Sequence, residues 1–148
     1  MADVLQFGEP EPGQDYVDRP AAFGVLERDG GIALVRIERD GEAAYDLPGG
    51  AIDAGEDAAA ALVREFGEET GLKVRAAALL GRASQYKSGD GKRVNNRSAH
   101  FVVELEGGGA ALKTEDDHEL VWAEPLDAIA RLRHASHAWA VACWLRAR

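Results

Sequence analysis

Three glutamates, Glu65, Glu68 and Glu69, stand at spacings i, i+3 and i+4 in the segment VREFGEETG. On a helix these spacings make carboxylates close neighbours, with Cβ atoms about 5–6 Å apart, where like charges repel. Two unit charges about 4 Å apart interact by about 1 kcal/mol in water and by about 4 kcal/mol near a protein surface. Uptake of a proton or of a divalent cation relieves such repulsion, and hard oxygen ligands completed by water and phosphate oxygens suit Mg²⁺. A solvated acidic helix face without any ion is the simpler alternative.

The helix that carries these carboxylates is expected over residues 56–70, a segment rich in alanine. It starts with two acidic residues, which the helix dipole favours, and it is followed by Gly71 as a stop signal. Measured from the centre of the apolar stripe, Glu69 lies about 70° away, Glu65 about 110° away and Glu68 nearly opposite. We therefore expect Glu65 and Glu69 to flank the core, and Glu68 to be shielded only if a loop covers that side. The stripe consists of Ala59, Leu62, Val63 and Phe66.

The residues before the helix extend this pattern. In order, the chain has Gly50, five residues, Glu56, seven residues, and then Arg64, Glu65, Phe66, Gly67, Glu68, Glu69, Thr70, Gly71 and Leu72. This arrangement resembles the Nudix box, G-x5-E-x7-R-E-U-x-E-E-x-G-U, in which U is a bulky apolar residue. Every fixed position of the box is filled, within residues 50–72 of the 148-residue chain.

The resemblance implies a divalent-metal-dependent hydrolase. In Nudix enzymes the loop and helix bind divalent cations that bridge the diphosphate of a nucleoside diphosphate linked to another group, X. The positions that match the metal ligands are Glu65, Glu68 and Glu69, with the backbone carbonyl of Gly50 as a further donor. The implied cofactor is Mg²⁺ or Mn²⁺, which would polarise phosphoryl oxygens and lower the pKa of an attacking water.

Further catalytic roles follow from the same resemblance. Glu56 and Arg64 look like the pair that braces the loop against the helix, with Arg64 also orienting a ligating glutamate. An ordinary salt bridge between them is compatible with that role. The general base of the family is sometimes a glutamate outside the box, and Glu119 is the first candidate, ahead of Glu104 and Glu115. The alternative for Glu119 is a solvated acid at a loop edge.

Substrate contacts are less specified by the sequence. Several basic residues could hold distal phosphates, although each of them taken singly fits a surface residue better than a site residue. A tyrosine could stack on a nucleobase, although Tyr45 fits core packing better than this role. The candidates are Arg28, Arg36, Lys87, Lys92, Arg93 and Arg97 for phosphates, and Tyr86 for a base.

Composition and charge limit the class of protein. A length of 148 residues with 46% hydrophobic and 29% charged residues is typical of one globular domain. The net charge of −9 argues against a stable nucleic-acid partner or binding to an anionic membrane, although a local cation can still bind a small phosphorylated substrate. Cys143 is the single cysteine, so an intrachain disulfide and a Cys-rich zinc site are excluded. With no signal peptide and no long apolar run, we expect a cytoplasmic protein.

The elements that must position the glutamates suggest an α+β fold. Residues 1–18, rich in Gly, Pro and acids, are expected to form a flexible arm before a single domain over residues 19–148. The sequence predicts strands over residues 21–28 and 32–38 as a hairpin, over 72–86 and 98–106 flanking a polar loop at 87–97, and over 118–125. Residues 126–148 predict one or two helices broken near 134–136. Because strands and helices do not alternate regularly, a mixed β-sheet with helices packed on its faces is expected. The resemblance to the Nudix family implies the same arrangement, an α/β/α sandwich with helices on both faces of a mixed sheet.

The substrate class within the family is narrowed only by markers outside the box. The proline typical of many ADP-ribose hydrolases is missing after the box, and Pro48 replaces a glutamine common in RNA-decapping relatives. These markers favour a nucleoside triphosphate or a dinucleoside polyphosphate. ADP-ribose or a nucleotide sugar is the alternative, and a non-catalytic nucleotide sensor is a further one, although such sensors usually lose box glutamates. The apolar C-terminal helix and the habit of the family are compatible with a homodimer.

Overall fold

The computed structural model describes residues 4–89, 91–110 and 113–148. Its elements are β1 (Leu5–Phe7), β2 (Val17–Arg28), β3 (Gly31–Arg39), β4 (Glu42–Asp46), β5 (Gly49–Ala51), α1 (Ala58–Thr70), β6 (Leu72–Gly89), β7 (Lys92–Ala110), β8 (Glu119–Ala123), α2 (Pro125–Arg131) and α3 (Ala135–Ala147). No helix within these ranges is both long enough and apolar enough to cross a membrane.

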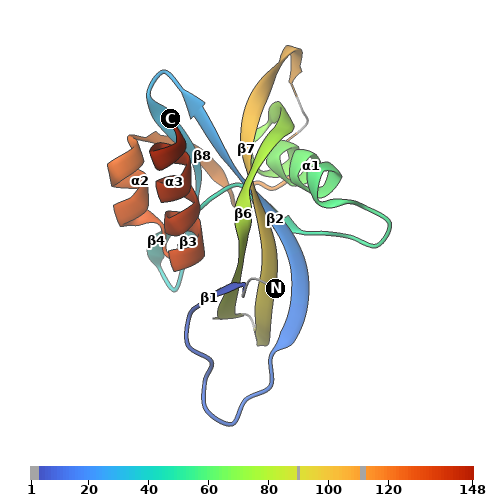
Figure 1. The fold of residues 1–148 in the computed structure, drawn as a ribbon, viewed down its shortest axis with the longest axis vertical. Helices are drawn as coiled ribbons and strands as arrows, with labels where there is room; N and C mark the ends of the chain where they lie inside the picture. Colours follow the sequence, from blue (N-terminus) through green and yellow to red (C-terminus); the bar gives the residue numbers. More distant parts are fainter. Residues whose placement is uncertain (1–3, 90, 111–112) are drawn as a thin grey trace.

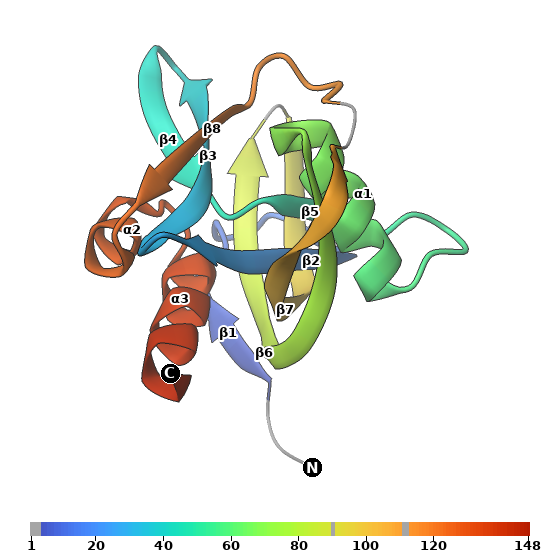
Figure 2. The same ribbon diagram turned by 90° about the horizontal axis from the view of Figure 1, so that it is seen from above.

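The described strands join into one mixed sheet. Its order is β1-β6-β7-β2-β3-β4, with β5 paired to β2 and β8 paired to β3. The pairs β1–β6 and β2–β7 are parallel, and the other pairs are antiparallel. Strand β2 is the centre of this arrangement, with β3, β4 and β8 to one side of it and β6 and β7 to the other (Figures 1 and 2). The expected hairpin between β2 and β3 is present but short, because most of β2 pairs with β7.

Strand β2 connects the two layers of the core. Its residues Ala21–Leu26 are all buried, which is the pattern of a strand covered on both faces. Successive side chains of a strand point to opposite faces. Accordingly, Phe23 and Val25 pack with α2 and α3, whereas Ala22 and Leu26 pack with α1.

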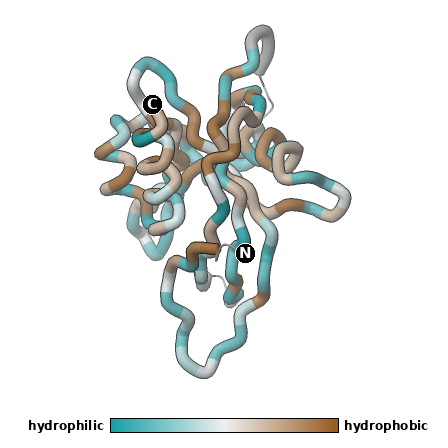
Figure 3. The backbone as a smooth tube through the Cα atoms, viewed as in Figure 1, coloured by the Kyte–Doolittle hydropathy of each residue, from teal (hydrophilic) through white to brown (hydrophobic). Residues whose placement is uncertain are grey.

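Helices therefore cover both faces of the sheet, α1 on one face and α2 with α3 on the other (Figure 1). In Figure 3 the hydrophobic colour concentrates where the strands pass between these helices, while the connection from β1 to β2 is mostly hydrophilic. The break between α2 and α3 falls at residues 132–134, close to where the sequence predicts it. The α+β class and the α/β/α sandwich are thus confirmed.

Helix α1 begins two residues later than the sequence predicts. The side chain of Asp57 caps it by accepting a hydrogen bond of 2.7 Å from the N–H of Ala60. Glu56 instead accepts a hydrogen bond from the N–H of Asp53 in the preceding loop. At the other end Gly71 adopts the left-handed conformation, with φ of 77°, as expected of a helix stop.

The long polar loop predicted at residues 87–97 is wrong, because most of that segment continues β6 and β7 as paired strands. Its polar side chains find partners that lie far away along the chain. The side-chain amide of Asn95 exchanges hydrogen bonds with that of Gln6, and the oxygen of Asn96 accepts one from Nε of Arg19 at 2.8 Å. These pairings make a polar strand stable there, and local sequence patterns do not reveal them.

The structure also differs from a loose arm over residues 1–18. Strand β1 runs parallel to β6, with Leu5 opposite Ala83, and β2 already begins at Val17. The partner strand β6 lies far along the sequence, so a three-residue strand between Gly- and Pro-rich segments gives no local signal. Residues 1–3 lie outside the described ranges.

Candidate active site

The segment before α1 approaches the helix through two glycines at the start of β5. Gly49 has φ of +145°, and a Cβ atom there would lie 2.2 Å from the carbonyl oxygen of Ala22. Its N–H donates a hydrogen bond of 3.0 Å to Oε1 of Glu69. Glycine is therefore required at this position, and its backbone ties the segment directly to a glutamate of α1.

Gly50 makes room for a second glutamate. A Cβ atom on Gly50 would lie 2.8 Å from Cδ and 2.9–3.0 Å from both carboxylate oxygens of Glu65. The backbone at Gly50 and the carboxylate of Glu65 therefore lie side by side, as a shared ligand position requires. The role of the Gly50 carbonyl as a metal ligand stays a prediction.

Arg64 holds the glutamates in place. Its Nε and Nη2 donate to the carboxylate of Glu56 at 2.8 and 2.9 Å, and these hydrogen bonds lower the pKa of Glu56 to about 2. Its Nη1 donates to Glu65 at 3.1 Å and to Glu68 at 3.2 Å. Its Nη2 also reaches the carbonyl of Ala51 at 3.2 Å. One guanidinium thus connects the loop, Glu56 and two of the three helix glutamates. This is the geometry that the resemblance implies for the pair of Glu56 and Arg64.

The three helix glutamates are shielded to different degrees. The side chain of Glu69 is 8% exposed, that of Glu65 14% and that of Glu68 31%. Burial raises the pKa of Glu69 well above its usual value, although the N–H of Gly49 opposes the shift. Burial also raises the pKa of Glu65, with the hydrogen bond from Arg64 acting in the opposite direction. The order of shielding agrees with the helical arc derived from the sequence.

A loop covers the side of α1 that carries Glu68. The N–H groups of Thr114 and Glu115 both donate to the backbone carbonyl of Glu68 at 3.0 Å. This places the carboxylate of Glu115 beside Glu65 and Glu68, with one oxygen of each within 4.8 Å of the others. Glu115 also forms such a group with Glu69 and His118, whose Nε2 lies 3.5 Å from Glu69.

This donor set fits a hard divalent cation. Four carboxylates converge from two directions, α1 and the 114–118 loop, and burial raises the pKa of two of them, Glu65 and Glu69. Oxygen donors that do not fill a coordination sphere leave positions for water and phosphate oxygens, which is how Mg²⁺ is held in phosphate sites. The described residues therefore fit Mg²⁺ or Mn²⁺ at this place.

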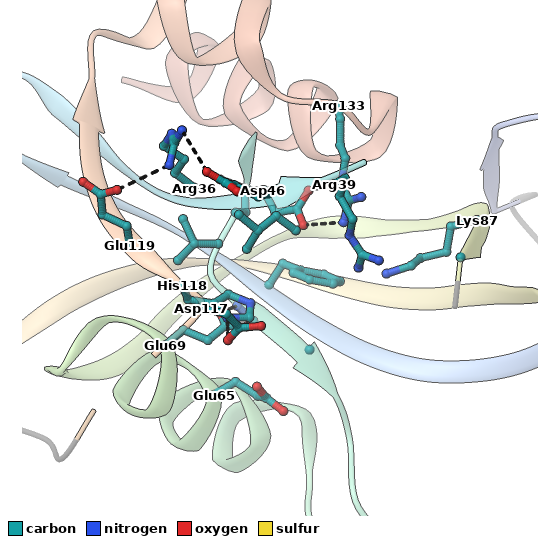
Figure 4. Close-up of a pocket in the computed structure, with 18 of the residues that line it drawn as sticks. Arg36, Arg39, Asp46, Glu65, Glu69, Lys87, Asp117, His118, Glu119 and Arg133 are labelled. Atoms are coloured by element: carbon teal, nitrogen blue, oxygen red, sulfur yellow. Dashed lines mark hydrogen bonds and ion pairs between the residues drawn. The ribbon is translucent and has the colours of Figure 1, made fainter. Parts of the chain in front are cut away.

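A cavity of about 970 Å³ opens beside the carboxylates. Figure 4 shows Glu65, Glu69, Asp117 and His118 on one wall, with Arg36 and Glu119 at one end and Lys87, Arg39 and Arg133 at the other. Gly49 and Gly50 also line it. The cavity is thus acidic on one wall and carries cations on the opposite wall, which suits an anionic ligand held partly through metal ions.

Among the candidates for a general base, the structure brings Glu115 into the carboxylate cluster. Glu119 lines the cavity, but its side chain is 66% exposed and lies 3.7 Å from Arg36 (Figure 4). Glu104 forms an ion pair with Arg75, and neither Glu104 nor Glu115 is among the described residues that line the cavity. Glu115, and not the first candidate Glu119, therefore lies beside the helix glutamates.

Of the predicted substrate contacts, Arg36 and Lys87 line the cavity. Arg28, Tyr86, Lys92, Arg93 and Arg97 are not among the described residues that line it.

Most of these outlying candidates have other partners. Arg28 lies over the ring of Trp122, Arg93 pairs with Glu11, Arg97 pairs with Asp18, and Tyr86 contacts the ring of Tyr16.

The cavity also contains charged residues that the sequence does not indicate. They include Arg19, Arg39, Asp46, Arg133 and His118. Each stands on a different element, and none belongs to a local motif. Only the folded sheet brings them together, so spacing along the sequence carries no signal for them.

Comparisons with known proteins agree with this geometry. The sequence model of the NUDIX domain matches residues 17–145. The chain is 32% identical over 110 residues to "Putative mutator protein MutT4" of Mycobacterium tuberculosis, covering 73% of this chain and 44% of that protein. It is 36% identical over 99 residues to "ADP-ribose pyrophosphatase" of Methanocaldococcus jannaschii, covering 66% of this chain and 56% of that protein. The chain thus spans about half the length of these relatives.

A solved structure supports the fold independently. A NUDIX hydrolase from Nitrosomonas europaea superposes with a TM-score of 0.72 over 88% of this chain and 90% of that chain, at 20% identity. At this identity the likeness shows the fold alone. The solved structure shows the same fold, the family model matches residues 17–145, and the box over residues 50–72 is complete. This chain is therefore a member of the NUDIX family.

Proposed function

We propose that the chain is a divalent-metal-dependent pyrophosphohydrolase that uses water to cleave a phosphoanhydride bond in a nucleoside diphosphate linked to X. The observation that carries this proposal is the carboxylate cluster of Glu65, Glu68, Glu69 and Glu115 beside the cavity. The names of the relatives, which include a pyrophosphatase, support the same reaction class.

The proposed metal ligands are Glu65, Glu68, Glu69 and the carbonyl of Gly50. When bound, Mg²⁺ or Mn²⁺ would polarise the phosphoryl oxygens and favour deprotonation of a water molecule. Arg64 keeps two of these carboxylates oriented, since it donates to Glu65 and Glu68 at 3.1 and 3.2 Å. The N–H of Gly49 fixes Glu69 in the same way.

We assign the general base to Glu115 in preference to Glu119. Glu115 is a carboxylate outside the box that lies within the cluster, where a water attacking a bound phosphate would be placed. Its position is fixed by backbone hydrogen bonds to Glu68, so it can accept a proton without a change in the path of the loop. Glu119, at the far end of the cavity beside Arg36, is then a substrate-side residue.

A turnover screen tests the proposal. Purified protein with Mg²⁺ or Mn²⁺ is assayed against nucleoside triphosphates, dinucleoside polyphosphates, ADP-ribose and nucleotide sugars. Running the best substrate in ¹⁸O-labelled water identifies the phosphorus that is attacked. We expect at least one substrate to be hydrolysed, and we expect Glu68→Gln and Glu69→Gln to abolish that turnover.

The exposed Glu42 on β4 offers a matched control, because Glu42→Gln removes one carboxylate far from α1. The proposal is refuted if no substrate is hydrolysed with either metal. It is also refuted if Glu68→Gln and Glu69→Gln retain activity comparable to Glu42→Gln.

A further inference from the structure

Besides the helix glutamates, the cavity carries a second group of like charges. Arg19 of β2, Arg39 of β3, Lys87 of β6 and Arg133 between α2 and α3 all line it, and we call this group the cationic wall. In Figure 4 Arg39, Lys87 and Arg133 gather on one side, well separated from Glu65 and Glu69. Four separate elements therefore contribute one positive charge each to the same surface.

Lys87 is the member of the cationic wall that most directly offers donors to a ligand. Its side chain is largely buried, and burial lowers its pKa, with the neighbouring charge of Arg19 adding to the shift. Within the described part of the chain, its ammonium has no hydrogen bond and no ion pair. An ammonium carries three donors, so three positions are available to an acceptor from outside the protein.

The acidic residues nearby do not neutralise the cationic wall. Asp46 is engaged by Arg133, whose Nε and Nη2 both donate to its carboxylate at 2.8 Å. Arg19 donates through Nε to Asn96, an uncharged partner; burial lowers the pKa of Arg19, and the charge of Glu65 opposes this shift without a direct ion pair. Asp40 also lines the cavity, but it is exposed at the turn after β3. The cationic wall therefore keeps a net positive charge.

Like charges held together in a partly buried place need a counter-ion, for the same reason that the carboxylate cluster does. Arginine and lysine at such places suit phosphate oxygens, arginine through paired donors and lysine as a point charge. The carboxylate cluster and the cationic wall face one cavity of about 970 Å³, which can hold a nucleotide-sized ligand. A single substrate can therefore occupy both ends.

We propose that the cationic wall binds a second anionic group of the substrate, beyond the diphosphate that is cleaved. This inference rests on the proposed function and narrows its substrate class. The preferred substrate has a third or further phosphate in its chain, or an X group that itself carries a phosphate. A nucleoside diphosphate whose X is an uncharged sugar leaves the cationic wall without its counter-ion and is a poor substrate.

Steady-state kinetics with three kinds of substrate test this selectivity. ADP-ribose has an uncharged X, ADP-ribose 1″-phosphate carries a phosphate monoester on its X group, and diadenosine tetraphosphate has a longer phosphate chain. We expect kcat/KM to be highest for a substrate with the additional phosphate. Comparison of the last two compounds tells which source of negative charge the cationic wall accepts.

The substitution Lys87→Gln removes the charge of Lys87 with little change in size. We expect it to lower the ratio of kcat/KM for the preferred anionic substrate to kcat/KM for ADP-ribose by about tenfold or more, the loss typical of one charged hydrogen bond. Lys87→Arg, which keeps the charge, should retain most of the ratio. Lys73→Gln is the matched control, since Lys73 lies on the same strand, β6, is half exposed and does not line the cavity.

Binding without catalysis gives an independent measurement. Metal-stripped protein in chelator-free buffer is titrated with inorganic tripolyphosphate in a calorimeter. We expect binding that weakens as NaCl is raised, that is reduced by Lys87→Gln and that is unchanged by Lys73→Gln. Melting temperatures of the variants confirm that each one is folded.

The outcomes separate this inference from the proposed function. If no substrate is hydrolysed, the proposed function fails. If substrates are hydrolysed but ADP-ribose is preferred, or if Lys87→Gln leaves the ratio of kcat/KM unchanged, the cationic wall does not select an anionic group and this inference alone is overturned.

Discussion

The substitution Glu69→Gln should make the metal-free protein more stable at neutral pH. Glu69 is buried, and burial raises its pKa well above the usual value. A carboxyl group with a raised pKa in the folded state contributes stability that is complete below the pKa of the unfolded chain, about 4.3, and that is lost as pH rises through the folded pKa. Each unit of difference corresponds to about 1.4 kcal/mol. Glutamine keeps an acceptor for the N–H of Gly49 and carries no charge.

A divalent cation should make the wild type more stable than Glu69→Gln. A ligand at one hundred times its dissociation constant adds about 2.7 kcal/mol to the free energy of unfolding. For a domain of this size about 1 kcal/mol shifts the melting temperature by about 2–4 °C. We therefore expect Mg²⁺ or Mn²⁺ to raise the melting temperature of the wild type by about 5–10 °C, and to raise that of Glu69→Gln by less than half as much.

Thermal unfolding followed by circular dichroism or calorimetry measures both effects, from pH 5 to pH 8, with and without metal. Glu42→Gln provides the control for a general change in net charge. The difference in stability between Glu69→Gln and the wild type should grow as pH rises in the metal-free series. If the variant is less stable than the wild type throughout that range, or if metal stabilises both equally, the assignment of Glu69 as a poorly compensated metal ligand is wrong.

Four further substitutions test the geometry of the site. Gly50→Ala places a Cβ atom 2.8 Å from Cδ of Glu65, so it should displace that carboxylate and lower kcat by about a hundredfold, with the far-UV circular dichroism spectrum unchanged. Arg64→Lys keeps the charge but loses the fork of donors, and metal titrations should show an affinity weaker by about 10–100-fold. Glu115→Gln should lower kcat by about a hundredfold or more and Glu119→Gln by less than about tenfold; the opposite order in steady-state assays assigns the base to Glu119.

The local part of the candidate site is predictable from the sequence. The apolar stripe of α1 and the spacing of its acids place Glu65 and Glu69 beside the core, and both are shielded in the structure. Gly71 ends the helix in the left-handed conformation that its residue type suggests. These features depend on contacts within a few residues, where helix geometry alone determines which side chains are neighbours.

The non-local part is not predictable in this way. Lys87 falls in a segment that reads as a polar loop, because its stabilising partners come from β1 and β2. Glu115 and Glu119 cannot be ranked from the sequence, because only the docking of one loop onto α1 separates them. Arg133 reaches the cavity through its pairing with Asp46, a contact between segments 87 residues apart. Such positions follow from the pairing of distant strands and not from local spacing.

The way in which the 114–118 loop attaches to α1 has an evolutionary consequence. The hydrogen bonds at residues 114 and 115 run from main-chain N–H groups to the main-chain carbonyl of Glu68, so the side chains at these two positions are not needed for this attachment. Side chains at positions 114 and 115 can therefore be exchanged, by mutation or by design, while the backbone keeps its course. A descendant enzyme could acquire a different proton acceptor or a different metal preference at position 115 without rebuilding the helix that supports it. The side chain at position 115 can thus change independently of the backbone contact that holds the loop.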